Sequence, residues 1–481
     1  MSDTPKTPNQ LRVEAMAERM ADVEEQSGSP TMCTAKWLQS TVYLMNGHTH
    51  SCHHPSAHRI PIEEIKRKPS ALHNTEFKIE QRKKMLNGER PAECQYCWNV
   101  EDLPGKHFSD RTYKSSDIGW SYPNLQKVIE SKEGSDIAPS YLEVAFDNTC
   151  NLKCMYCSPD ISSKWMEEIK QFGPYPTTHN LGNIEWLKQT GKMPIPNREE
   201  NPYVDAFWEW WPELYKSLHT FRITGGEPLL SKQTWRVLEE IKNNPRKDLT
   251  LAINTNMQVP DEMLNRLIQY YNDIAPNIKS FDIYTSCEAH GKQAEFIRTG
   301  LDYDSFLANC RKFLSETGSD SRLNMMITFN VLSLSTFDLF LKDIWTMRTE
   351  FNADDAMNRV PMMINYLRWP QFQDVRVAPA DVKTTYLAKI KDYVSAHMRN
   401  TSPDLAGRFY LEELDQIERL GEYMFEPLDA NYHLTQKKDF GAFYEEYEHR
   451  RNVDFQETFP ELLNYYTECK YIADNAKPGP I

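Results

Sequence analysis

The sequence predicts an α/β protein with a sheet of parallel strands, and two observations support this fold class. Between residues 139 and 375, short apolar runs alternate with longer stretches of helical character, an order that is typical of parallel βα units. The chain of 481 residues also has 40% hydrophobic and 26% charged residues. It is therefore long and apolar enough to bury a core rather than remain disordered.

Six apolar runs are the predicted strands. They cover residues 141–146, 220–224, 249–254, 280–285, 325–331 and 362–367. Parallel strands end at a common edge, and folds of this kind place their active sites in the loops at that edge. Side chains directly after these runs are therefore the first candidates for chemistry.

The rest of the chain divides into four predicted regions. Residues 1–30 are a polar N-terminal segment, and residues 31–102 are a small domain with a hairpin, a helix and four cysteines. Residues 103–138 are a linker with Gly, Pro and Ser, and residues 376–481 are a helical C-terminal region. In the second region, Asn46-Gly47 lies between two strand-like stretches. This pair predicts a hairpin with a two-residue turn, because both turn positions need positive φ.

The charge balance and the cysteine content restrict the class of protein. A formal net charge of −14 disfavours a general partner for nucleic acid or an anionic membrane. Because the sequence has neither an apolar run of about 18 residues nor the apolar core of a signal peptide, we expect a cytoplasmic protein. The ten cysteines are then expected to be reduced, and their spacing points to metal or redox chemistry.

The strongest motif follows the first predicted strand and has the sequence Cys150-Asn-Leu-Lys-Cys154-Met-Tyr-Cys157. Three thiolates within eight residues can converge on one soft metal centre. A structural zinc ion normally has four protein ligands, whereas an iron–sulfur cubane on three cysteines keeps one iron open for a substrate or cofactor. The alternative is a zinc site that a distant Cys or His completes.

A second motif, Thr224-Gly225-Gly226-Glu227-Pro228, follows the second predicted strand. Its two glycines allow the backbone to approach a ligand closely. The backbone carbonyls and the Glu227 carboxylate can accept hydrogen bonds from an ammonium group. By itself, the motif fits a plain tight turn equally well.

Together, the two motifs resemble the CxxxCxxC and GGEP motifs of the radical S-adenosylmethionine (radical SAM) enzymes, in the same order and on the same elements. The resemblance covers about residues 139–370 and implies a partial (β/α)6 barrel. It also implies that Cys150, Cys154 and Cys157 hold a [4Fe-4S] cluster whose open iron chelates S-adenosylmethionine (SAM). One electron, from a donor such as flavodoxin or ferredoxin, would cleave SAM to methionine and a 5′-deoxyadenosyl radical that abstracts a substrate hydrogen.

The same resemblance implies roles for residues around this cluster. Tyr156 would lie beside the adenine of SAM. Gly225, Gly226 and Glu227 would line the amine of its methionine part.

A further stretch, from Thr285 to Gly300, is similar to one in peptide-modifying relatives. By that similarity Ser286 would contact the ribose, and Arg298 would pair with the methionine carboxylate through its planar fork of donors. A surface arginine on a helix is the alternative for Arg298. Cys287, at a predicted strand end near this site, is a candidate hydrogen-atom donor, although lone cysteines are usually small buried hydrophobes.

The third group of cysteines lies in the first hundred residues and comprises Cys33, Cys52, Cys94 and Cys97. Four thiolates make a closed site, which suits zinc or an iron–sulfur cluster. A hairpin between two cysteines, a helix and then CxxCW resembles the auxiliary-cluster module, SPASM or the shorter twitch, of radical SAM enzymes. The resemblance favours an auxiliary [4Fe-4S] cluster, although this module usually follows the barrel and here precedes it.

These patterns predict a radical SAM enzyme with an auxiliary iron–sulfur cluster. Relatives with such modules modify peptides, proteins or small molecules, so the resemblance leaves the substrate open. The competing hypothesis is a non-catalytic zinc-binding interaction protein with two cysteine sites. A three-cysteine motif beside Gly-Gly-Glu-Pro argues against it, because a structural zinc protein has no use for an open coordination position.

Overall fold

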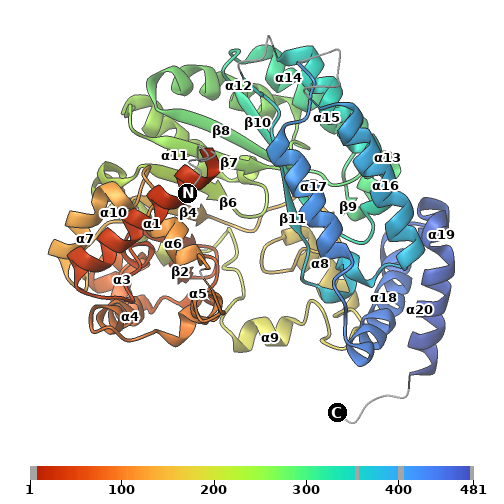
Figure 1. The fold of residues 1–481 in the computed structure, drawn as a ribbon, viewed down its shortest axis with the longest axis horizontal. Coiled ribbons are helices and arrows are strands. Elements are labelled where there is room, and N and C mark those ends of the chain that lie inside the picture. Colours follow the sequence, from red (N-terminus) through yellow and green to blue (C-terminus); the bar gives the residue numbers. More distant parts are fainter. Residues whose placement is uncertain (1–7, 106, 353–356, 399–405, 477–481) are drawn as a thin grey trace, which may run out of the picture. The chain divides into compact units, whose positions relative to one another are not determined.

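The computed structural model describes residues 8–105, 107–352, 357–398 and 406–476 (Figure 1). The chain forms two compact units. The first contains Met1–Asp147, Gly191–Gly225 and Arg246–Ala252, and the second contains Asn148–Thr190, Gly226–Pro245 and Ile253–Ile481.

All six predicted strands are present. They are β4 (Tyr141–Ala145), β6 (Thr220–Thr224), β7 (Thr250–Thr255), β8 (Ser280–Ser286), β10 (Arg322–Phe329) and β11 (Met362–Tyr366). They belong to a nine-stranded sheet with the order β11-β10-β8-β7-β6-β4-β1-β2-β3. In the first unit β4 pairs with β6 in parallel, and in the second unit β10 pairs in parallel with β8 and β11. The predicted α/β fold with a mostly parallel sheet is thereby confirmed.

Helices connect these strands, as the alternation of apolar runs and helical stretches predicts. They are α8 (Ser163–Phe172), α9 (Ile184–Gln189), α10 (Pro202–Ser217), α11 (Lys232–Asn243), α12 (Asp261–Ile274), α13 (Gly291–Ile297), α14 (Tyr303–Glu316) and α15 (Phe337–Phe351). Helix α11 illustrates the local cause. The Ser231 side chain caps its first turn by accepting from the backbone N–H of Gln233, and Trp235 and Leu238, three residues apart, bury one face.

The N-terminal hairpin is present, but its turn differs from the prediction. Strands β1 (Gln39–Tyr43) and β2 (His48–His50) pair with Tyr43 opposite His48, so the loop has four residues instead of two. Only Gly47 of the Asn46-Gly47 pair has positive φ, at 66°. The Tyr203 ring occupies the space that a Cβ of Gly47 would need, so close packing as well as backbone conformation requires glycine here.

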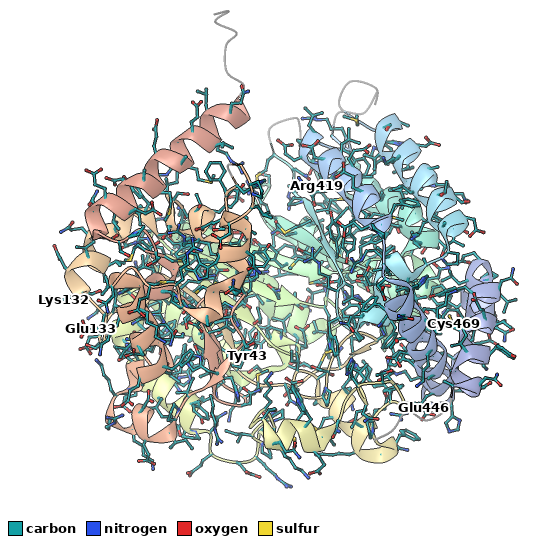
Figure 2. The ribbon with its side chains drawn as sticks, turned by 60° about the horizontal axis from the view of Figure 1, so that its bottom comes forward. Tyr43, Lys132, Glu133, Arg419, Glu446 and Cys469 are labelled. Carbon is teal, nitrogen blue, oxygen red and sulfur yellow. The ribbon has the colours of Figure 1, made fainter. Side chains whose placement is uncertain are left out.

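The hairpin also extends the main sheet of the first unit. Strand β1, which ends at Tyr43 (labelled in Figure 2), pairs in parallel with β4, with Thr41 opposite Glu143. Strand β3 (His58–Arg59) pairs with β2 on the other side. The hairpin that supplies Cys52 is therefore anchored to the same sheet as the strand that leads to the Cys150 loop.

The predicted linker at 103–138 is instead part of the packed first unit. It contains α6 (Asp110–Ser115) and α7 (Leu125–Ser131), and Leu125, Val128 and Ile137 lie in a buried cluster with Trp37. Leu125 and Val128 are spaced for one helix face, a signal too short to stand out in a polar stretch. The other helices before β4 are α1 (Pro8–Ser27), α2 (Ala35–Leu38), α3 (Ile62–Arg67), α4 (Glu76–Leu86) and α5 (Gln95–Glu101).

The C-terminal region is helical, as predicted. It contains α16 (Ala380–Ala396), α17 (Leu411–Met424), α18 (Ala430–Arg451), α19 (Phe455–Thr458) and α20 (Leu463–Asn475). Helices α18 and α20, which carry Glu446 and Cys469 in Figure 2, pack so closely that a Cβ on Gly441 of α18 would overlap the backbone of Cys469. Among the described residues, no helix has the length and apolar character needed to cross a membrane.

Candidate functional site

The loop after β4 brings Cys150, Cys154 and Cys157 together in the second unit. Its turn is closed by a hydrogen bond from the N–H of Cys157 to the carbonyl of Cys154, at 3.0 Å. Ser163, at the start of α8, receives the N–H of Cys150 at 3.1 Å and donates to its carbonyl at 3.2 Å. The backbone of the loop is thus held by its own turn and by the helix that follows.

The three thiols are half-buried, and burial dominates their acidity. Desolvation raises the pKa of Cys150 to about 11 and also raises the pKa of Cys154 and of Cys157. Without a metal these thiols carry their protons at pH 7. A metal centre that binds them must release those protons and supply the positive charge that stabilises the thiolates.

A buried polar network lies directly behind Cys154. The two-residue strands β5 (Lys153–Cys154) and β9 (Arg298–Thr299) pair with Arg298 opposite Cys154. The guanidinium donates from Nη2 to Glu288 Oε2 at 2.6 Å, from Nε to the same carboxylate at 3.1 Å, and from Nη2 to the Tyr156 hydroxyl at 2.5 Å. The Tyr156 hydroxyl in turn donates to Glu288 at 3.2 Å.

Arg298 also faces the cysteine sulfur itself, with Nη1 lying 3.7 Å from Cys154 Sγ. Of its five N–H groups, three are used by Glu288 and Tyr156 and a fourth is directed at this sulfur. Arg298 and Glu288 are 4% and 1% exposed. The structure therefore places Arg298 within a buried ion pair rather than on the helix surface, and its predicted contact with a methionine carboxylate stays a prediction.

The Gly-Gly-Glu-Pro turn packs against the residues that precede Cys150. In the second unit, a Cβ on Gly226 would lie 2.8 Å from the carbonyl carbon of Thr149, and the N–H of Glu227 donates to the Thr149 carbonyl at 2.7 Å. In the first unit, Gly225 has φ 127° and lies against the Asp147 carbonyl. Glycine is required at 226 because backbone meets backbone there.

The Glu227 carboxylate is used by the chain itself. It accepts the N–H of Leu229 at 3.0 Å and the N–H of Asn256 at 2.7 Å, and only 1% of the residue is exposed. Burial raises the pKa of Glu227 to about 7, against the lowering effect of these two hydrogen bonds. The carboxylate ties the turn to the end of β7, and its predicted contact with an amine stays a prediction.

The remaining two predicted residues lie at the end of β8. Ser286 is its last residue. Cys287 is fully buried and donates from Sγ to the Ala289 carbonyl at 3.3 Å, and burial raises its pKa to about 12. This position is typical of a packed core cysteine, and its role as a hydrogen-atom donor stays a prediction.

The sequence analysis missed the support that helix α18 gives to the cysteine loop. Arg451 donates to the Lys153 carbonyl and pairs with Glu168 at 3.1 Å. The Tyr444 hydroxyl lies 3.1 Å from Met155 Sδ, and Tyr447 contacts Thr299 at 2.7 Å. The spacing of Tyr444, Tyr447 and Arg451 on one helix face was the available signal, but it does not identify the surface that this face covers.

A cavity opens beside the same loop. It has a volume of about 440 Å³ and begins at Ser158, directly after Cys157. Two half-exposed tryptophans, Trp186 and Trp369, line it together with His179 and Asp160. Its size, and a lining that combines polar residues with two tryptophans, suit a small molecule or a side chain of a larger ligand.

The first unit holds the second group of cysteines. Cys33, Cys52, Cys94 and Cys97 line one small cavity, although they come from the loop before α2, the loop after β2 and the start of α5. Burial raises the pKa of Cys94 to about 12 and that of Cys97 to about 11. Three basic side chains line the same cavity, namely Lys36, Arg111 and Lys114. Each of them pairs with a carboxylate of the chain, on Glu93, Glu101 and Asp110 respectively.

Ligand atoms around a single ion must lie close together. Among the described residues, the only set with three Cys, His, Asp or Glu ligand atoms within 4.8 Å of one another is His53, His54 and Asp110. Two sulfurs on one zinc ion, at about 2.3 Å each, lie at most about 4.6 Å apart. Within the described part of the chain, neither group of cysteine sulfurs forms such a set in the metal-free chain.

Comparison with protein families agrees with the motifs. Residues 144–344 match the model of the Radical SAM superfamily. The matched segment runs from β4 to α15 and includes the Cys150 loop, the Gly-Gly-Glu-Pro turn and Arg298. This segment is therefore similar to radical SAM domains.

Comparison with individual proteins adds little. No curated protein matches the chain. Among solved structures, the chain is similar to Streptococcus suis SuiB bound to S-adenosylmethionine, with 12% identity, 77% of this chain and 71% of that chain covered, and a TM-score of 0.36. SuiB bound to the precursor peptide SuiA gives 12% identity, coverage of 77% and 70%, and a TM-score of 0.33. TM-scores this low do not establish a common fold, so we base no conclusion about this chain on these structures.

Proposed function

On the premise that residues 144–344 form a radical SAM domain, we propose that the chain is an enzyme that cleaves SAM at a [4Fe-4S] cluster held by Cys150, Cys154 and Cys157. The observation that carries this proposal is the loop of three half-buried thiols within a segment that matches the Radical SAM family model. When bound, the cluster and SAM supply a 5′-deoxyadenosyl radical for hydrogen abstraction.

The residues of the chain prepare this site in three ways. The β5–β9 pairing and Ser163 hold the thiols in place, so their positions do not depend on a mobile loop. Arg298 directs an N–H group at Cys154 Sγ, and hydrogen bonds to cluster sulfurs tune the reduction potential. Glu288 and Tyr156 fix that guanidinium from the other side.

We propose that Cys33, Cys52, Cys94 and Cys97 hold an auxiliary [4Fe-4S] cluster. Support comes from the single cavity that all four cysteines line. Four cysteine ligands leave no open iron, which favours electron transfer over substrate binding. This cysteine region precedes the radical SAM domain in the chain, whereas the auxiliary module usually follows it. We therefore base the proposal on the four cysteines and not on their position in the chain.

We further propose that the radical SAM domain is a partial (β/α)6 barrel and that the cavity after Cys157 admits the substrate. The motifs imply that the substrate is a peptide, a protein or a small molecule. Flavodoxin or ferredoxin is the proposed electron donor, and the cytoplasm the proposed location. The cavity residues support a ligand with a planar or cationic group, because Trp186, Trp369 and Asp160 are all among its lining residues.

The deciding experiment measures iron and sulfide after anaerobic purification. We expect about eight irons per chain in the wild type, and about four after Cys150, Cys154 and Cys157 are all changed to Ala or after Cys94→Ala/Cys97→Ala. Cys469→Ala, a buried cysteine outside both groups, is the matched control and should keep about eight.

The same preparations are then assayed for 5′-deoxyadenosine after reduction in the presence of SAM. Activity should vanish in the triple variant. Zinc in both cysteine groups, with no iron after reconstitution and no 5′-deoxyadenosine, would contradict the proposal and support the zinc-binding interaction protein instead.

A further inference from the structure

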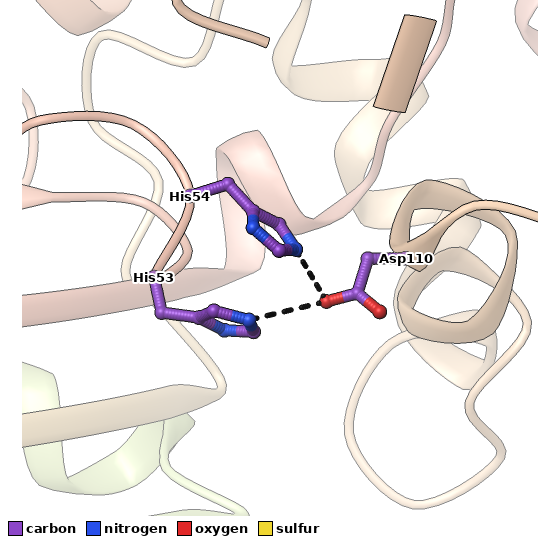
Figure 3. Close-up of side chains that lie close together, drawn as sticks. All are labelled: His53, His54 and Asp110. Carbon is purple, nitrogen blue, oxygen red and sulfur yellow. Dashed lines mark hydrogen bonds and ion pairs between the residues drawn. The ribbon is translucent and has the colours of Figure 1, made fainter. Parts of the chain in front are cut away.

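A cluster of two histidines and one carboxylate lies beside the cavity of the auxiliary cysteines. His53 and His54 follow Cys52 in the loop between β2 and β3, and Asp110 is the first residue of α6. All three belong to the first unit. Figure 3 shows both imidazole rings directed at one carboxylate oxygen of Asp110.

The distances within this cluster are those of ligands around one ion. His54 Nε2 lies 2.8 Å and His53 Nε2 lies 3.4 Å from Asp110 Oδ2, and the three ligand atoms lie within 4.8 Å of one another. A tetrahedral ion with bonds of about 2.0–2.1 Å holds its ligand atoms about 3.4 Å apart. We propose that His53, His54 and Asp110 bind a divalent transition-metal ion through two imidazole nitrogens and one carboxylate oxygen.

The ligands are partly fixed before any ion binds. The His54 ring stacks on Tyr96 of α5, with centroids 3.7 Å apart and planes 12° apart, and its side chain is 13% exposed. Asp110 is held by the start of α6. His53 is 64% exposed, so water reaches the ion from its side and fills the remaining coordination position. Two imidazoles with a carboxylate suit zinc or ferrous iron.

Lys114 is the residue that opposes the ion. Its Nζ lies 3.8 Å from Asp110 Oδ2 and 3.4 Å from His53 Nδ1. An ion at His53 Nε2 requires the proton on Nδ1, so Lys114 must turn its ammonium away, which its long side chain allows. The ammonium and the metal ion therefore compete for the same carboxylate.

The site has a consequence for the neighbouring cysteine. His54 makes a backbone hydrogen bond to the Cys52 thiol, and His53 is bonded covalently to Cys52. An ion held by these histidines and Asp110 joins the Cys52 loop to α6.

The test uses the full chain with its iron–sulfur centres reconstituted, and zinc as the probe. After gel filtration with excess zinc, the wild type should retain one zinc per chain, and X-ray absorption should show nitrogen and oxygen neighbours at about 2.0–2.1 Å rather than sulfur at about 2.3 Å. His53→Ala and Asp110→Asn should lose that zinc while their iron content stays unchanged. His219→Gln, which removes a histidine near a single carboxylate, Asp248, is the matched control and should retain the zinc.

Lys114→Gln gives an opposite expectation, because it removes the competing charge. Its zinc affinity should rise about tenfold. The proposal is overturned if His53→Ala and Asp110→Asn bind zinc like the wild type, or if all bound zinc has sulfur neighbours. Failure of the proposed iron–sulfur chemistry would look different. In that case the cysteine groups would bind zinc with sulfur neighbours in every variant. The zinc that depends on His53 and Asp110 would be seen in addition, by its nitrogen and oxygen neighbours.

Discussion

Replacing Gly226 by alanine tests whether the Gly-Gly-Glu-Pro turn positions the Cys150 loop. The added Cβ would lie 2.8 Å from the carbonyl carbon of Thr149 and 2.9 Å from that of Asn148. Carbon atoms in contact prefer about 3.5–4.0 Å, so one backbone must move by at least about 0.7 Å. The obstacle is backbone on both sides, and no rotamer change can relieve it.

This displacement reaches the cluster loop at once, since Thr149 directly precedes Cys150. It also strains the hydrogen bond from Glu227 to the Thr149 carbonyl, which measures 2.7 Å. Overpacking of this kind costs about 1–3 kcal/mol of folding stability. A misplacement near 1 Å in a catalytic site can lower the rate by about 100-fold.

The assay measures the rate of 5′-deoxyadenosine formation per cluster, together with the iron content and the urea midpoint. We expect Gly226→Ala to fold, to keep the auxiliary iron and to form 5′-deoxyadenosine about 100-fold more slowly. Gly421→Ala in α17, where the nearest atom is a Leu387 methyl at 3.1 Å, is the control and should match the wild type. A rate for Gly226→Ala within threefold of the wild type would refute the close-packing argument.

Three further predictions concern buried charges. Glu288→Gln leaves Arg298 buried without its anionic partner and should lower the free energy of unfolding by about 3 kcal/mol in urea melts; a loss below about 1 kcal/mol would mean that the pair contributes little. The raised pKa of Glu227, about 7, means that the folded state of the cluster-free protein retains this proton up to higher pH than the unfolded state. The protonated Glu227 side chain therefore adds up to about 3 kcal/mol to the free energy of unfolding below its ordinary pKa, and this contribution is lost as the pH rises towards 7. Glu227→Gln should remove this pH dependence from unfolding curves measured at several pH values. Arg451→Met removes the charge that pairs with buried Glu168 and should speed the loss of iron on exposure to air, measured by the decay of cluster absorbance; unchanged decay would argue that α18 does not stabilise the loop.

Local patterns predicted much of the fold. The six strands and their helices were recognisable because apolar periodicity is a property of consecutive residues. The three cysteines of the 150–157 motif also converge for a local reason, since one short turn carries all of them. The hairpin was predicted for the same reason, but its turn length was wrong, because the packing of Tyr203 on Gly47 is a contact between residues far apart in the chain.

The segment at 103–138 shows where composition misled the sequence analysis. Its Gly, Pro and Ser residues favour a linker, yet Leu125 and Val128 bury one face of α7 in the core of the first unit. Short helices with two buried residues leave a weak periodic signal, and only the surface they cover makes them stable.

The sequence by itself determined the fold class, the six strands between residues 139 and 375 and the Cys150–Cys157 motif, because each of these depends on spacing within a short stretch. The tertiary structure alone decided which distant groups meet. It placed Arg298 between Cys154 and Glu288, set α18 behind the cysteine loop, and brought His53 and His54 to Asp110. These contacts depend on how β9, α18 and α6 pack, and packing is set by the burial of whole faces rather than by any local pattern.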